Sequence, residues 1–184
     1  MPPTDVLAFW FSQPPANWFR KNEAFDTDIR ARFGATIDVA LNGGLRAWDE
    51  EGPAGTLARI LVLDQFTRNA FRGTPASFAG DALALAAAQS LVDSGADQQL
   101  TPAQRSFAYM PFEHAEDPAM QARAIDLFGK LATDHDGFGD TLEFARRHAR
   151  VIARFGRFPH RNAILGRAST PEEAAFLLEP GSGF

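Results

Sequence analysis

The stretch that decides the fold is FDTDIRARFGATIDVALNGG, residues 25–44. Its large apolar residues recur at every fourth position, and this period places them along one face of an α-helix. They are Phe25, Ile29, Phe33, Ile37 and Leu41. The glycine pair Gly43-Gly44 that follows is a typical helix terminator. The segment therefore predicts a long amphipathic helix that buries one apolar stripe.

Similar helical patterns continue through the rest of the chain. Thr101-Pro102 and Asp117-Pro118 each place a capping oxygen before a proline, which is the pattern of a helix start. Thr170-Pro171-Glu172-Glu173 adds a capping box. No segment shows the two-residue alternation of a strand. We therefore expect an all-α fold of about eight or nine helices, built from antiparallel helix pairs, as a single domain over residues 1–184.

The composition excludes several classes of protein. A hydrophobic content of 45%, with 17 Phe, supplies a large core, so disorder is not expected. The chain has no cysteine, which removes disulfides and thiol catalysis. We expect no membrane span and no signal peptide, and hence a cytoplasmic location. The net charge of -5 argues against nucleic-acid binding.

The segment between Phe144 and Pro171 reverses the sign of the overall charge, because it contains seven arginines and no acidic residue. The arginines are Arg146, Arg147, Arg150, Arg154, Arg157, Arg161 and Arg167. The Arg-Asn-Ala turn in this segment, at residues 161–163, repeats one at residues 68–70. Two such turns predict cationic corners that face one anionic group. Internal ion pairs that pin helices together are the alternative.

A set of polar residues at these turns is predicted to line a ligand-binding groove. The set is Asp64, Arg68, Asn69 and Arg72 at the first corner, Arg157, His160, Arg161 and Asn162 at the second, and Glu113 and Glu116 from the segment between. Other interpretations stay open. Asp64 and Arg68, four residues apart, also fit a structural clasp, and the two glutamates also fit neutralisation of nearby arginines.

The histidines do not form a metal-binding pattern, since none lies four residues from another and no Glu-x-x-His pair occurs. His114 and His148 share their helix faces with apolar residues, so we expect both in the core. His160 lies between arginines that favour its neutral form. We expect neither a metal nor a cofactor.

Several motifs together resemble the bacterial family catalogued as domain of unknown function 924. They include Leu63-Asp64-Gln65-Phe66, Glu113-His114-Ala115-Glu116 and the run from Arg154 to Asn162. The resemblance covers nearly the whole chain. It implies an all-helical fold similar to tetratricopeptide α-α superhelices, and it implies no activity.

Three hypotheses for the function follow. The first is a binding protein whose groove holds a small anionic molecule or an acidic peptide end through forked arginine contacts. The second is a metal-independent enzyme acting on a phosphorylated or carboxylated metabolite, with Glu113 or His160 moving the proton. In the third, the polar cluster is purely structural. The sequence indicates no oligomeric state.

Overall fold

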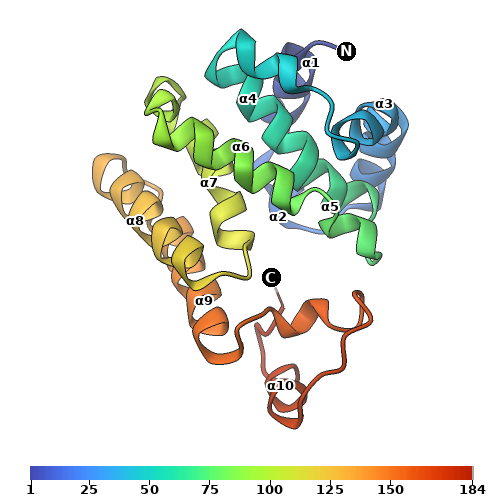
Figure 1. The fold of residues 1–184 in the computed structure, drawn as a ribbon, viewed down its shortest axis with the longest axis vertical. Coiled ribbons are helices and arrows are strands. Elements are labelled where there is room, and N and C mark those ends of the chain that lie inside the picture. The colour runs from blue at the N-terminus through green and yellow to red at the C-terminus, as the bar shows by residue number, and fades with distance from the viewer. Residues whose placement is uncertain (184) are drawn as a thin grey trace. The chain divides into compact units, whose positions relative to one another are not determined.

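The computed structural model describes residues 1–183, and within them it contains ten α-helices and no strand (Figure 1). The all-α prediction is confirmed, with a helix count slightly above the expected eight or nine. In this part of the chain no helix combines the length and hydropathy needed to cross a membrane. The tetratricopeptide-like superhelix stays a prediction.

Contacts between residues divide the chain into two compact units. Unit 1 comprises Met1–Arg72 and Ala76–Pro111, and unit 2 comprises Gly73–Pro75 and the chain from Phe112 onward. The division falls inside one helix, α7 (Pro102–His114). The single domain expected over residues 1–184 stays a prediction.

Unit 1 is built around aromatic side chains. Its first six helices are α1 (Pro3–Phe11), α2 (Pro15–Phe19), α3 (Glu23–Leu41), α4 (Pro53–Ile60), α5 (Thr67–Ala70) and α6 (Asp81–Asp93). Short 3-10 segments lie at Arg46–Glu51, Pro75–Phe78 and Ala96–Gln99. The Trp10 ring lies 5.6 Å from that of Phe66 and 5.5 Å from that of Phe107. The first four residues of the predicted apolar stripe on α3 are buried, and Leu41 at its end is half-buried.

Helix α4 continues into α5 through a π-helical segment, η2 (Leu61–Phe66). All six side chains of η2 are buried, including the polar Asp64 and Gln65. Thr67 stabilises the end of the segment, because its hydroxyl donates to the carbonyl of Leu63 over 2.7 Å. Single π-helical turns are rare in proteins, and those that occur are often found at functional sites. No local pattern in the sequence predicted the π-helical segment.

Unit 2 packs α8 (Pro118–Asp134) against α9 (Gly139–Phe155), followed by the 3-10 turn η5 (Pro159–Arg161) and α10 (Pro171–Phe176). Val151, Ile152 and Phe158 form a buried cluster. The helix starts match the predictions: Asp117 accepts from two backbone amides of α8, and a full capping box begins α10 at Thr170.

Candidate functional site

The ten candidate residues are divided between the two units. Asp64, Arg68, Asn69 and Arg72 belong to unit 1, and Glu113, Glu116, Arg157, His160, Arg161 and Asn162 belong to unit 2. We call the first group the first corner and the residues 157–162 with their partners the second corner. The convergence of both corners on one ligand stays a prediction.

Asp64 and Arg68 form the pair expected from their spacing. The Asp64 side chain is fully buried in η2, and its Oδ1 lies 3.0 Å from Nη1 of Arg68. Arg68 also donates to both carboxylate oxygens of Asp81 on α6, at 3.0 and 3.2 Å. Burial alone would lower the pKa of Arg68, but the two carboxylates raise it above its ordinary value. These contacts tie η2 and α5 to the start of α6.

Asn69 and Arg72 share another carboxylate, that of the buried Asp26 on α3. Asn69 Nδ2 donates to Oδ1 of Asp26 over 2.7 Å, while Arg72 donates through Nε over 2.7 Å and Nη2 over 3.0 Å. Burial alone would raise the pKa of Asp26, but the hydrogen bonds from Arg72 and Asn69 hold it below its ordinary value. Arg30 donates to the carbonyl of Ala70, which places a second arginine at the same end of α5.

The outer edge of Arg72 faces away from this carboxylate. Its side chain is 39% exposed, and its Nη1 donates to no acceptor within residues 1–183. Asp26 therefore fixes one edge of the guanidinium and leaves Nη1 available to a ligand.

At the second corner, the Glu116 carboxylate connects Arg167 to the backbone of the turn at Phe158. Its carboxylate accepts from Arg167 at 2.7 and 2.9 Å and from the backbone amide of Phe158 at 2.8 Å. Burial alone would raise the pKa of Glu116, but these hydrogen bonds lower it. The expectation that this glutamate neutralises an arginine of the C-terminal segment agrees with the contact.

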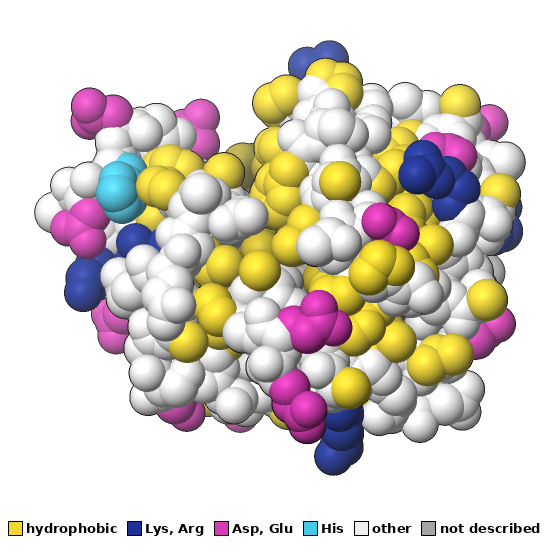
Figure 2. Space-filling view, turned by 90° about the horizontal axis from the view of Figure 1, so that it is seen from above, with side chains coloured by type: hydrophobic (Ala, Val, Ile, Leu, Met, Phe, Trp, Pro, Cys, Tyr) yellow, Lys and Arg dark blue, Asp and Glu magenta, His cyan; other side chains and the backbone are white. Residues whose placement is uncertain are grey.

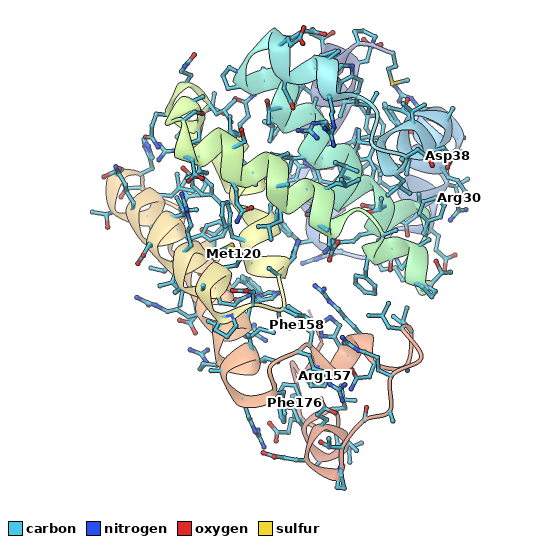
Figure 3. All side chains as sticks on the ribbon, in the orientation of Figure 1. Arg30, Asp38, Met120, Arg157, Phe158 and Phe176 are labelled. Carbon is cyan, nitrogen blue, oxygen red and sulfur yellow. The ribbon has the colours of Figure 1, made fainter. Side chains whose placement is uncertain are left out.

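Arg157 and Asn162 meet at a second carboxylate, Glu173 of the α10 capping box. Arg157 donates to it through Nε over 2.6 Å and Nη2 over 2.8 Å, and Asn162 Nδ2 donates over 3.2 Å. The hydrogen bonds from Arg157 and from the Thr170 amide lower the pKa of Glu173 to about 2. Arg157 is 30% exposed, and its Nη1 has no acceptor in the described chain. Figure 3 shows Arg157 near Phe158 in this part of unit 2.

The two corners thus share one local arrangement. In each, a buried carboxylate accepts from the asparagine of an Arg-Asn pair and from the Nε and Nη2 of a nearby arginine. The sequence repeat predicted two related corners, but it did not identify Asp26 and Glu173 as the residues that organise them. Each carboxylate lies on a distant helix or capping box, so only the fold reveals it.

Arg161 and His160 occupy the turn η5. Arg161 is buried, donates to the carbonyl of His114 over 3.0 Å, and lies 4.6 Å above the Phe158 ring. Burial, followed by the positive charge of Arg161, lowers the pKa of His160 to about 4. His160 is therefore neutral near pH 7, as its arginine neighbours predicted.

Glu113 pairs with a histidine rather than with an arginine. Its Oε1 lies 2.8 Å from Nδ1 of His148, and the Phe144 carbonyl lies 2.9 Å from the same nitrogen. Since both partners accept, Nδ1 carries the proton, and the carboxylate orients the ring. His148 is buried, as predicted, and its ring lies 6.2 Å from that of the half-buried His114.

Three of the four histidines therefore lie in one polar region of unit 2, which their sequence spacing did not predict. His148 and His160 both lie against the Phe158 ring, at 5.5 and 5.6 Å. Within the described chain, no three His, Asp or Glu residues are grouped so that they could hold a metal ion.

On the face drawn in Figure 2, basic and acidic side chains are interspersed. Over its whole length the chain has 23 acidic and 18 basic residues.

Comparisons with known proteins identify relatives of unassigned function. The chain matches a family described as bacterial protein of unknown function (DUF924) over residues 6–181. It also resembles the solved structure of ATU0120, a protein of unknown function from Agrobacterium tumefaciens, with 43% identity and a TM-score of 0.88 over 96% of both chains. No curated protein matches the chain.

Proposed function

Because this chain belongs to the DUF924 family of bacterial proteins of unknown function, we propose a function from its own polar residues: each corner binds a small anionic molecule, through Arg72 in unit 1 and through Arg157 in unit 2. The observation that carries the proposal is the arrangement that the two corners share. Each arginine is clamped by a buried carboxylate on one edge and directs Nη1 away from that carboxylate.

Such an arginine is well suited to hold an anion. A charge-assisted hydrogen bond from a guanidinium is stronger than a neutral one, and a forked contact adds geometric specificity. The clamp also restricts the side chain before the ligand arrives, so less conformational entropy is lost on binding. The ligand class is a small phosphorylated or carboxylated molecule, and the remaining predicted residues of each corner would position it there.

The test is isothermal titration of the protein with phosphate, pyrophosphate and citrate, repeated on Arg72→Lys and Arg157→Lys. Lysine retains the positive charge but loses the planar fork, so we expect each variant to weaken binding about 10-fold. Arg46→Lys is the matched control, because Arg46 is exposed and lies outside both corners. Absence of binding to any of these anions, or equal affinity of all four proteins, would refute the proposal.

A second candidate function rests on the contact between Glu113 and His148. A histidine oriented through Nδ1 by a carboxylate is a common arrangement for a general base that takes a proton from the attacking group. The histidine of this enzyme hypothesis is thus His148, because His160, with a pKa of about 4, is a weak base. Hydrolysis of a phosphate ester or carboxylic ester that His148→Gln abolishes while the fold survives would support it. Turnover that His148→Gln leaves unchanged would exclude it.

The structural hypothesis makes the opposite prediction for both corners. If the arginines serve only to hold helices together, Arg157→Lys lowers stability without changing the affinity for any anion. Urea denaturation of the same variants measures the loss of stability, and isothermal titration measures the affinity for the anions.

A further inference from the structure

The outer face of α9 carries a groove that neither corner uses. Its volume is about 350 Å³, and one wall carries three arginines on successive turns of the helix. We call it the arginine groove; its principal lining residues are Arg147, Arg150, Arg154, Phe155, Phe176 and Glu179. All of them belong to unit 2.

The three arginines form a regular row of positive charge. At a rise of 1.5 Å per residue, their Cα atoms are separated by about 4.5 Å and then about 6 Å along the helix axis. Like charges at these spacings repel one another on a helix. A ligand with negative charges at a similar repeat would relieve the repulsion along the whole row.

Two of the three arginines pair with exposed carboxylates, whereas Arg147 donates to the carbonyl of Gly181 over 3.2 Å. Arg150 pairs with Glu143 over 2.8 Å with side-chain exposures of 64% and 52%, and Arg154 pairs with Glu172 over 3.1 Å with exposures of 46% and 63%. Ion pairs in this setting contribute little to stability. An incoming carboxylate can therefore replace them with little loss.

The floor of the groove is aromatic. The rings of Phe155 and Phe176 lie 5.1 Å apart, and the Arg154 guanidinium lies 4.6 Å from the Phe155 ring centre. Phe176 is labelled in Figure 3. Val151 and Pro180 also line the groove. The groove therefore presents apolar surface beside its row of positive charge.

We propose that the arginine groove binds an acidic peptide segment with apolar residues between its carboxylates. An extended strand places every second side chain about 6.6 Å apart, close to the step between Arg150 and Arg154. The alternate side chains would then contact the aromatic floor. A nucleic acid fits less well, because the chain as a whole carries a net charge of -5. This site is separate from the anion sites proposed at Arg72 and at Arg157.

Glu179, an acidic residue that lines the groove, allows a second test of the proposal. Glu179 lies among the arginines that line the groove and would repel an acidic ligand. Removing its charge with Glu179→Gln should therefore strengthen binding. A structural role for this residue would give no such gain.

The probe is a fluorescein-labelled peptide of about nine residues with glutamate at alternate positions and leucine or phenylalanine between them. Its partner is the same peptide with glutamine in place of glutamate. Fluorescence anisotropy is measured at about 50 mM salt, where exposed charges are weakly screened. We expect the acidic peptide to bind at least about 10-fold more tightly than its neutral partner. The double variant Arg150→Gln/Arg154→Gln should lower the affinity for the acidic peptide about 10-fold, and Glu179→Gln should raise it about 2-fold to 3-fold.

Arg146→Gln is the matched control, because Arg146 lies on the same helix, is 51% exposed and does not line the groove. It should change the affinity less than about 2-fold. Circular dichroism checks that each variant is folded, and Arg150→Gln alone replaces the double variant if that one unfolds. Equal binding of both peptides, equal losses for the control and groove variants, or equally tight binding of a single-stranded oligonucleotide would each overturn the proposal.

Discussion

Replacement of Asp26 by alanine should destabilise unit 1 well beyond the effect of losing an ordinary surface carboxylate. Asp26 is 6% exposed and accepts three hydrogen bonds, one from Asn69 and two from Arg72. The substitution removes the acceptor from both donors and one of the links between α3 and the end of α5, while the contact of Arg30 with the Ala70 carbonyl remains.

The expected magnitude follows from the burial of the two donors. Asn69 is 7% exposed, so its amide cannot regain water, and a buried unsatisfied donor costs about 1–3 kcal/mol. Arg72 is 39% exposed and recovers most of its solvation, so its share stays below about 1 kcal/mol. We therefore expect the free energy of unfolding to fall by about 2–3 kcal/mol.

Urea denaturation of the purified variants measures this change. The control is Asp28→Ala on the same helix, whose carboxylate lies 3.5 Å from Arg32 with both side chains about half exposed; we expect a change within about 0.5 kcal/mol. A double-mutant cycle of Asp26→Ala with Asn69→Ala should give a coupling of about 1–2 kcal/mol. A loss from Asp26→Ala no larger than that of the control, or a coupling near zero, would refute the reasoning.

Three further predictions concern packing and titration. Gly80→Ala should cost about 1–3 kcal/mol because the new Cβ meets the Leu63 carbonyl, whereas Gly34→Ala, in open space within α3, should stabilise the chain by up to about 1 kcal/mol; urea denaturation compares them. His160 should titrate in NMR spectra with a pKa of about 4. Because this pKa lies below the ordinary histidine value of 6.5, stability should fall as pH drops from 6.5 to 4, and His160→Gln should reduce that fall. Glu173 has a pKa of about 2 against an ordinary value of 4.5, so its contribution to stability is complete above pH 4.5 and is lost as pH falls towards 2. Glu173→Gln should flatten the pH dependence of thermal stability over that range, and an unchanged pH profile would contradict the assignment.

The sequence predicted helices well where local chemistry decides them. The capping oxygens of Asp117 and Thr170 lie beside prolines that cannot continue a preceding helix, and both act as caps. Gly156 ends α9 with a φ of 69°, a conformation that glycine adopts at little cost.

The polar sites were predicted in part, for a physical reason. The contact between Asp64 and Arg68 follows from helical spacing, so the sequence contains it. The clamps on Arg72 and Arg157 come from carboxylates 46 and 16 positions away, which no local period reveals. The pairing of Glu113 with His148 likewise depends on tertiary packing in unit 2.

The π-helical segment η2 has a consequence for insertions and deletions. A π-helical turn holds one residue more than an α-helical turn, so deleting one residue from Leu61–Phe66 would let an ordinary α-helix form with the following residues close to their present orientation. Inserting a further residue would instead rotate the following residues by about 100° around the helix axis, and this would turn Asn69 away from Asp26 and Arg68 from Asp81. Homologues should therefore accept the loss of one residue in this segment more readily than a gain.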